Sequence, residues 1–315
     1  MTDSSRASAF RSSEAVLLWA REAGLVADAP AERRLARMRL EVLAEGALPH
    51  GRTCDVALTG QWAAFICWVD DHIDRYGLEW AAGEFERFAA PLREVFTADA
   101  GVPSTTSPHA VVLSGLWERT AAGMPDVWRA RFAAEYLDFL DASEEEVALR
   151  RAGVLLPVAD YVRLRRRTIT LLPMLVVLER TGGAPVVETA GVAAGLRDLR
   201  WAVADVAGWA NDLASEADDA AAGQDNLVAA LAREEACSKV AARLRVSAMI
   251  EERRAGFRAD ASALRTGRGV LPEQPGLCRY VDLVENFMAA TLHWLAVTGR
   301  FASGPSVPYP PANQF

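Results

Sequence analysis

Apolar residues recur at intervals of three and four along most of the chain, and sustained two-residue alternation is almost absent. The first spacing places apolar side chains on one face of an α-helix, whereas alternation is typical of a half-buried β-strand. This periodicity predicts an all-α fold. The expected helices cover approximately residues 13–25, 30–46, 54–76, 79–97, 108–123, 125–142, 157–181, 186–220, 224–266 and 276–300.

The chain is expected to form one domain with two short tails. Pro30 follows Asp28 closely, an order typical of the first turn of a helix. Loops or breaks are expected at 98–109, 182–185 and 267–276. Because no repeat or linker divides the sequence, we expect a single domain over 13–302. A disordered tail is expected at 1–12 and a proline-rich tail at 303–315.

Composition excludes several classes of protein. Hydrophobic residues make up 51% of the 315 residues, which excludes an intrinsically disordered chain. The net charge of −8 argues against a nucleic-acid-binding protein, and no apolar run reaches the roughly 18 residues of a membrane span. The four cysteines form no CxxC pair, and the N-terminus lacks the apolar core of a secretion signal. A reduced, cytoplasmic protein is therefore expected.

The first motif that indicates chemistry is DDHID, at the end of a mostly apolar segment. On a helix, Asp70 and Asp74 are one turn apart and share a face, with Asp71 beside them. Carboxylates near a helix C-terminus repel each other and oppose the helix dipole, so they need a counter-charge. Mg²⁺ would supply it, because this ion prefers oxygen ligands and keeps waters and substrate phosphates in its shell. The alternative interpretation is a solvated acidic helix end.

A second polar set follows the same logic. Asn211, Ser215 and Asp219 are spaced at i, i+4 and i+8, so they share one face of a helix. An amide oxygen, a hydroxyl and a carboxylate in line are a ligand set suited to Mg²⁺. Asn and Ser lower helix propensity in a helix interior, which favours a functional reason over an ordinary polar helix face.

Taken together, the two motifs resemble those of bacterial class I terpene synthases, which pair DDxxD with a downstream NDxxSxxxE triad. DDHID matches the first motif in full, and NDLASEADD matches the second except that Asp219 stands where the family has Glu. The resemblance implies a single-domain helical bundle around a central apolar cavity, three Mg²⁺ ions and a prenyl diphosphate substrate. The implied metal ligands are Asp70, Asp71, Asp74, Asn211, Ser215 and Asp219.

The resemblance also implies a diphosphate-binding set. The diphosphate-sensing arginine of the family falls 46 residues before Asn211, at Arg165, and its planar fork suits phosphate oxygens. The neighbouring Arg166 and Arg167 leave the register open, so Arg166 is included in the set. An Arg-Tyr pair of the family corresponds to Arg300 followed by phenylalanine, which keeps the charge and loses the phenol hydroxyl.

A helix break is expected close to these arginines. Thr168, Ile169 and Thr170 form a β-branched run, and Pro173 follows it. In the family, such a break presents a backbone carbonyl to the ionising substrate. The resemblance places this role at Thr168 and Ile169, where the family often has Asp or Thr followed by Gly.

The implied activity is metal-triggered ionisation of an allylic diphosphate, followed by conversion of the carbocation to a terpene hydrocarbon or alcohol. A carbocation needs a dry cavity with apolar and aromatic walls. The expected aromatic lining residues are Phe65, Trp68, Trp201, Trp209 and Trp294, although core packing is the alternative for each. Small residues before both metal motifs slightly favour a twenty-carbon over a fifteen-carbon substrate, linear or pre-cyclised.

Two rival functions remain open at this point. A trans-prenyltransferase also uses aspartate-rich helices, but it typically carries a second DDxxD and lysines, whereas Lys239 is the only lysine here. A metal-free helical scaffold or binding protein is the rival from a different class. An antiparallel homodimer is common in the resembled family.

Overall fold

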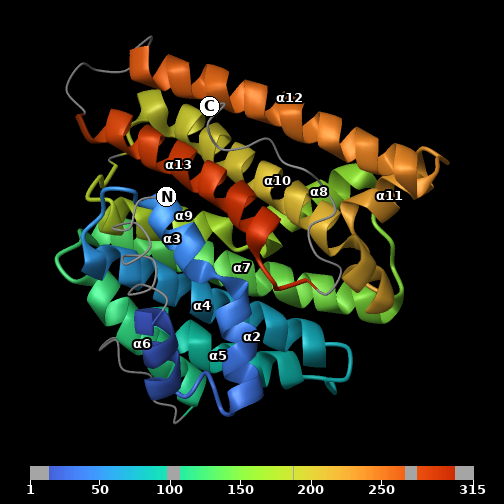
Figure 1. Ribbon diagram of the computed structural model, residues 1–315, viewed down its shortest axis with the longest axis horizontal. Coiled ribbons are helices and arrows are strands. Elements are labelled where there is room, and N and C mark those ends of the chain that lie inside the picture. The colour runs from blue at the N-terminus through green and yellow to red at the C-terminus, as the bar shows by residue number, and fades with distance from the viewer. Residues whose placement is uncertain (1–13, 98–106, 187, 267–274, 302–315) are drawn as a thin grey trace.

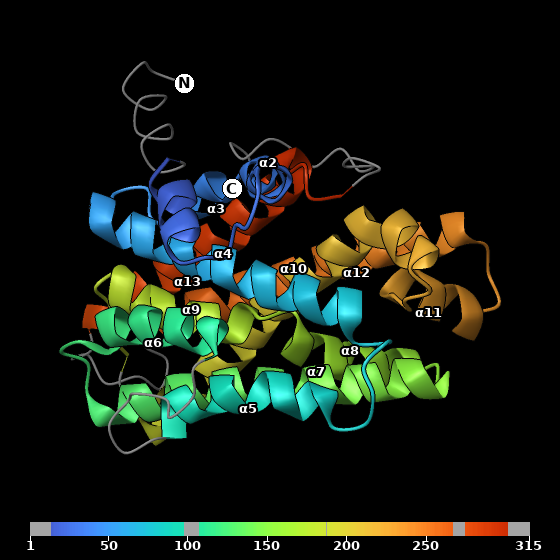
Figure 2. The same ribbon diagram turned by 90° about the horizontal axis from the view of Figure 1, so that it is seen from below.

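The computed structural model describes residues 14–97, 107–186, 188–266 and 275–301, and over these residues it is a bundle of α-helices (Figures 1 and 2). The predicted all-α class is confirmed. A first helix covers 14–22. The others are α2 Ala29–Met38, α3 Leu40–Ala47, α4 Thr53–Tyr76, α5 Glu84–Thr97, α6 Pro108–Ala121, α7 Asp126–Ala152, α8 Val158–Thr168, α9 Leu171–Thr181, α10 Ala190–Ala221, α11 Leu227–Glu234, α12 Lys239–Thr266 and α13 Pro275–Val297.

Two expected helices are each split by a residue in the left-handed conformation. Arg39, with φ of 54°, separates α2 from α3 inside the expected helix 30–46. Ala236, with φ of 49°, lies between α11 and α12 inside the expected helix 224–266. Neither residue is a glycine, so the sequence carried no ordinary signal for these breaks.

The predicted start of α2 is confirmed, whereas α5 and α7 have different ends from those predicted. Asp28 caps α2 by accepting a 2.7 Å hydrogen bond from the backbone N–H of Ala31. Helix α7 runs ten residues beyond the expected end at 142, to Ala152, and stops where Gly153 adopts φ of 65°. Helix α5 begins at Glu84 instead of 79. The expected tails at 1–12 and 303–315 lie outside the described residues.

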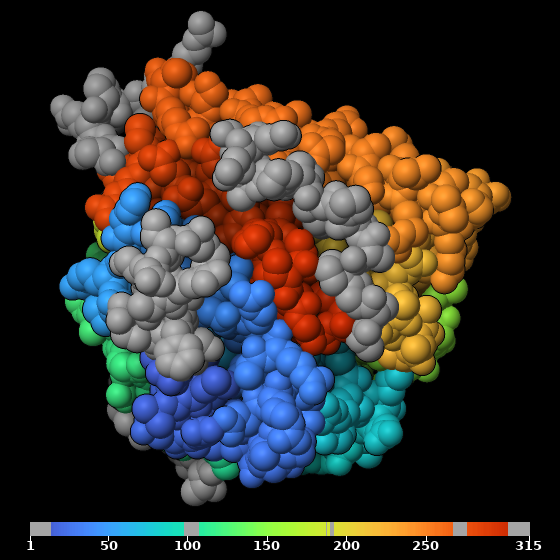
Figure 3. Space-filling view, viewed as in Figure 1, coloured from blue at the N-terminus to red at the C-terminus, as the bar shows by residue number. Residues whose placement is uncertain are grey.

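The long helices enclose the interior of the bundle. Helix α10 packs against α12 and α13, α13 packs against α3, and α4 packs against α3 and α9. In Figure 3 the C-terminal part of α13, in red, lies against α2 and α3, in blue. Within the described part of the chain, no helix is long and apolar enough to cross a membrane. This packing leaves a central cavity bordered mainly by α4, α7, α8, α9, α10 and α13.

Candidate active site

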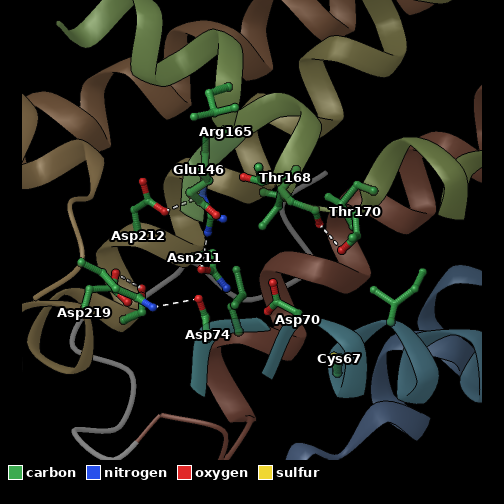
Figure 4. Close-up of a pocket in the computed structure, with 18 of the residues that line it drawn as sticks. Cys67, Asp70, Asp74, Glu146, Arg165, Thr168, Thr170, Asn211, Asp212 and Asp219 are labelled. Carbon is green, nitrogen blue, oxygen red and sulfur yellow. Dashed lines mark hydrogen bonds and ion pairs between the residues drawn. The ribbon is translucent and has the colours of Figure 1, made fainter. Parts of the chain in front are cut away.

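The DDHID carboxylates lie at the polar end of this cavity and are paired with arginines. Asp70 and Asp74 line the cavity, as Figure 4 shows. Asp71 does not belong to the lining. Arg300 donates from Nη2 to Asp70 Oδ2 at 2.6 Å and to Asp71 Oδ1 at 2.7 Å. On the other side, Arg150 lies 3.1 Å from Asp74 Oδ1. The positive charges therefore come from segments far away in sequence, Arg150 on α7 and Arg300 just after α13.

This pairing does not fully compensate the carboxylates. Burial, and then the neighbouring charge of Asp70, raise the pKa of Asp74 to about 6. Burial also raises the pKa of Asp71 above its usual value, although Arg300 opposes the shift. Like charges that crowd together in this way would be relieved by a bound cation. Carboxylate oxygens at this position are therefore chemically suited to a divalent metal.

The second polar set faces the first from α10. Asn211, Ser215 and Asp219 all line the cavity. Ser215 donates to Asp219 Oδ2 at 2.6 Å, and Asn226, the N-cap of α11, donates to the same oxygen at 3.1 Å. The shorter Asp219 side chain thus lies within hydrogen-bond reach of Ser215.

These ligands do not form a closed metal cage. Among the described residues, no group of three His, Cys, Asp or Glu side chains could hold a metal ion without further ligands. Mg²⁺ does not need such a cage, because it is usually bound by one or two carboxylates together with waters and substrate phosphates. The two opposed sets, each with one or two carboxylates, fit Mg²⁺ better than a metal that requires an all-protein site.

Of the three consecutive arginines on α8, only Arg165 reaches the cavity. Its Nη2 donates to Asn211 Oδ1 at 2.8 Å and its Nε donates to Asp212 Oδ1 at 2.9 Å. Arg166 instead makes a bidentate pair with Asp205, at 2.8 and 2.9 Å, and lies over the ring of Trp201. Arg166 therefore does not line the cavity, because successive residues point about 100° apart on a helix, and the geometry gives its place in the diphosphate-binding set no support.

Arg167 also points away from the cavity. It pairs with Asp138 and Glu145 on α7. Of the three registers that the sequence left open, the geometry favours the one at Arg165.

Arg300 reaches the cavity because the end of α13 is anchored to α2. Thr298 donates through Oγ1 to the Met38 carbonyl at 2.9 Å, and the Gly299 N–H donates to the Arg37 carbonyl at 2.8 Å. Phe301, the residue that replaces the tyrosine of the family, lines the cavity beside Arg300.

The predicted helix break is present. Helix α8 ends at Thr168 and α9 begins at Leu171, and between them Thr170 adopts the left-handed conformation with φ of 60°. Thr168, Ile169 and Thr170 all line the cavity. The residues of the break therefore border the cavity close to Arg165.

The remaining walls are apolar. The cavity has a volume of about 180 Å³. Its apolar lining includes Ile66, Leu171, Met174, Ala207, Phe287 and Trp294. A polar end with carboxylates and arginines thus adjoins an apolar pocket.

Only one of the five expected aromatic lining residues, Trp294, lies in this wall. Trp68 stacks instead against His72 and His109 on the far side of α4, with Phe65 next to it. The other two, Trp201 and Trp209, are also absent from the lining, and Trp201 is 36% exposed. Trp68 and Trp209 each precede a metal-motif residue by two positions, so they lie about 200° away around the helix.

Several cavity residues were not identified from the sequence. Tyr161 is buried and donates to Asp212 Oδ2 at 2.6 Å, which holds the carboxylate that orients Arg165. Glu146 lines the cavity, and its burial raises its pKa to about 7. Cys67, one turn before Asp70, also lines it, and burial raises the pKa of its thiol to about 11. These residues differ from their neighbours only in facing the cavity, which depends on how each helix is rotated about its axis within the bundle.

Two opposed sets of oxygen-bearing side chains on two helices, a buried arginine between them and a helix break beside an apolar cavity are the arrangement expected of a class I terpenoid synthase. The chain belongs to the terpene synthase family, because the model of terpene synthase family 2, C-terminal metal binding, matches residues 61–255. It is therefore a terpene synthase, a lyase that acts on a prenyl diphosphate.

Named relatives and a solved structure agree with this assignment. The chain is 28% identical to pristinol synthase of Streptomyces pristinaespiralis, over 93% of this chain and 81% of that protein. It is 29% identical to R-linalool synthase of Streptomyces clavuligerus, over 90% of this chain and 85% of that protein. The crystal structure of linalool/nerolidol synthase from Streptomyces clavuligerus with 2-fluorogeranyl diphosphate superposes with a TM-score of 0.83. That match has 28% identity and covers 91% of this chain and 98% of the other.

Proposed function

We propose that this terpene synthase uses Mg²⁺ to ionise a ten- or fifteen-carbon prenyl diphosphate, releases diphosphate, and converts the carbocation to a terpene. The observation that carries the proposal is the arrangement at one end of the cavity. Asp70 and Asp74 on α4 face Asn211 on α10, and Arg165 and Arg300 lie at the same end. The apolar pocket adjoins this end, where a hydrocarbon chain would extend.

The residues of the polar end divide into two roles. Asp70, Asp74, Asn211, Ser215 and Asp219 would hold Mg²⁺, for which the resemblance implies three ions. When bound, the metal neutralises the negative charge that develops on the diphosphate as the carbon–oxygen bond breaks.

Arg165 and Arg300 would bind the diphosphate oxygens. Guanidinium groups suit this task because they form charge-assisted, bidentate hydrogen bonds with phosphate. Arg165 is held by Asp212, whose carboxylate is only 1% exposed, so its guanidinium is oriented before substrate arrives. This orientation reduces the free energy needed to organise the site during ionisation.

The apolar wall would protect and fold the carbocation. Trp294 and Phe287 present aromatic side chains to the cavity, and an aromatic face stabilises a nearby cation by about 0.5 to 2 kcal/mol. The Ile169 carbonyl at the helix break is a further oxygen next to the site of ionisation. Leu171 and Met174 complete the wall beyond the break.

The packing of the small residues and a solved relative support a shorter substrate than the twenty-carbon chain that the sequence slightly favoured. Gly60 serves helix packing, because a Cβ atom there would lie 2.8 Å from Val16 Cγ2. Among the other small residues that precede the two metal motifs, Ala63 and Ala207 line the cavity. The complex of the related linalool/nerolidol synthase contains 2-fluorogeranyl diphosphate, an analogue of a ten-carbon substrate.

The proposal is tested by incubating the full chain and Mg²⁺ with geranyl, farnesyl and geranylgeranyl diphosphates. Released diphosphate and organic products, the latter identified by gas chromatography and mass spectrometry, are measured in parallel. We expect turnover of the ten- or fifteen-carbon substrate and loss of turnover in Asn211→Ala. The exposed Asp160→Asn variant on α8 is the matched control, and it should behave as the wild type. Turnover of geranylgeranyl diphosphate alone would contradict the proposed chain length.

A further inference from the structure

One carbonyl at the helix break has no partner within its helix. In a continuous helix, the Ile169 carbonyl would accept from the backbone N–H four residues later, at position 173. Pro173 has no N–H, so this bond cannot form. The oxygen is therefore available to a side chain or to a molecule in the cavity.

The Thr170 side chain takes up this carbonyl. Its Oγ1 donates to the Ile169 oxygen at 2.6 Å, the bond drawn as a dashed line in Figure 4. Thr170 holds φ of 60° and ψ of 10°, a conformation that is unfavourable for a β-branched residue and easy for glycine. A strained residue that lines a cavity and keeps a hydroxyl where glycine would fit better points to a function for that hydroxyl.

The bond also determines what the hydroxyl offers to the cavity. Because the Thr170 proton is directed to Ile169, the hydroxyl and carbonyl oxygens together offer only lone pairs to other molecules. We call the Ile169 oxygen and Thr170 Oγ1 the break oxygens.

We propose that the break oxygens hold one water molecule that captures the carbocation, so that the main product is a terpene alcohol. This inference rests on the proposed function. A water at an acceptor-only site donates its hydrogens to the protein and keeps its own lone pair free. That lone pair faces the apolar cavity in which the carbocation forms.

The capture step balances without an additional reactant. The water oxygen supplies both electrons of a new carbon–oxygen bond to the cationic carbon and becomes an oxonium. The oxonium then loses one proton to the diphosphate that ionisation released. The net reaction is prenyl diphosphate plus water to terpene alcohol plus protonated diphosphate. One fixed water is compatible with a cavity that excludes bulk water, because the walls around the break are apolar.

The main test uses ¹⁸O-labelled water with the full chain, Mg²⁺ and the ten- and fifteen-carbon diphosphates. We expect an alcohol as the main product, with one ¹⁸O atom per molecule. Diphosphate release with hydrocarbon as the main product would overturn the inference while leaving the proposed function intact. Absence of diphosphate release from any prenyl diphosphate would instead contradict the proposed function.

Three variants of Thr170 separate chemistry from structure. Thr170→Val removes the hydroxyl at nearly constant shape. Thr170→Gly removes the hydroxyl and relieves the backbone strain, whereas Thr170→Ser keeps the hydroxyl. The ratio of alcohol to hydrocarbon should fall about tenfold in the Val and Gly variants, the factor that corresponds to about 1.4 kcal/mol. The Ser variant should retain most of the wild-type ratio. An unchanged ratio in Thr170→Gly would overturn the inference even if Thr170→Val fails to fold.

A matched control is available in the same cavity. Thr291 on α13 also lines the cavity, and its hydroxyl donates to the carbonyl of Phe287 within its own helix. Thr291→Val should not change the ratio of alcohol to hydrocarbon. An equal fall in this variant would show that loss of any cavity hydroxyl is sufficient, which would contradict the assignment to the break oxygens.

Discussion

Arg165 Nη2 lies 2.8 Å from Asn211 Oδ1, so a residue expected to bind the diphosphate is hydrogen-bonded to one expected to bind the metal. Arg300 has the same relationship with Asp70 on the opposite side of the cavity, at 2.6 Å. The side chains expected to bind diphosphate and those expected to bind metal are thus hydrogen-bonded to each other. On the proposed roles, Mg²⁺ would compete with Arg300 for Asp70, and diphosphate would compete with Asn211 and Asp70 for Arg165 and Arg300. The two ligands should therefore bind much better together than separately.

Arg300→Gln should affect the two ligands in opposite directions. The substitution frees Asp70 and Asp71 from a positive charge, so Mg²⁺ alone should stabilise the variant more than the wild type. Affinity for diphosphate in the presence of Mg²⁺ should fall about tenfold to a hundredfold, because a charge-assisted hydrogen bond contributes about 1.5 to 3 kcal/mol. Thermal unfolding with Mg²⁺, with pyrophosphate and with both ligands measures the two effects.

Arg265→Gln is the control for this experiment. Its guanidinium pairs with Asp282 on α13, and it does not line the cavity. This variant should show the wild-type response to both ligands. If Mg²⁺ alone stabilised Arg300→Gln less than the wild type, the competition between arginine and metal would be disproved.

Arg165→Lys tests whether geometry matters beyond charge. Lysine keeps the positive charge but cannot donate to Asn211 and Asp212 through a planar fork, so the group would lose its orientation. We expect kcat/KM for the prenyl diphosphate to fall at least about a hundredfold, because two charge-assisted hydrogen bonds at about 1.5 kcal/mol each amount to about 3 kcal/mol.

The neighbouring Arg163→Lys is a matched control on the same helix. The Arg163 side chain is 71% exposed and pairs with Asp160 at the surface. Steady-state kinetics should not distinguish this variant from the wild type. A similar loss in both variants would show that α8 tolerates no change of arginine, which would remove the special role of Arg165.

The sequence was most informative where a residue's role depends on its own helix. The shared faces of Asp70 with Asp74, and of Asn211 with Ser215 and Asp219, follow from helical spacing alone. The break near Thr170 follows from local backbone chemistry, because β-branched residues and proline disfavour a continuous helix.

The sequence was least informative where a role depends on how helices are turned toward one another. Trp68 and Trp209 were as plausible for the cavity as Trp294 until the packing fixed which face of each helix points inward. Tyr161 and Glu146 gave no sequence signal, because their importance comes from buried partners on other helices. The pairing of Arg300 with Asp70 spans 230 positions, and no local pattern encodes it.

Asp219 should act as a metal ligand despite being one methylene shorter than the glutamate of the family. Its contact with Ser215 at 2.6 Å shows that the shorter side chain reaches its neighbour in the triad. Asp219→Ala should raise the Mg²⁺ concentration for half-maximal activity at least tenfold, about 1.4 kcal/mol, whereas Asp219→Glu should stay close to the wild type. The control Asp218→Ala changes an adjacent carboxylate that does not line the cavity, and it should leave the Mg²⁺ requirement unchanged. A normal Mg²⁺ requirement in Asp219→Ala would exclude this residue from the metal site.

The raised pKa of Asp74 should make stability without ligands and metal binding respond oppositely to pH. Because burial and Asp70 raise the pKa of Asp74 to about 6, the folded protein holds this proton at pH values where the unfolded chain has released it. The stability that the protonated group contributes is therefore lost as pH rises from about 4 through 6. Mg²⁺ requires the ionised carboxylate, so its affinity should increase over the same range.

Asp74→Asn isolates this group, because the amide does not titrate. Urea unfolding of both proteins without Mg²⁺, at pH 5 and pH 7.5, should show the variant gaining stability relative to the wild type at the higher pH. Stabilisation of the wild type by Mg²⁺ with pyrophosphate should be larger at pH 7.5 than at pH 5, and Asp74→Asn should lose part of that difference. A stability difference between the two proteins that stayed constant with pH would show that Asp74 titrates normally and that its carboxylate is already compensated by Arg150.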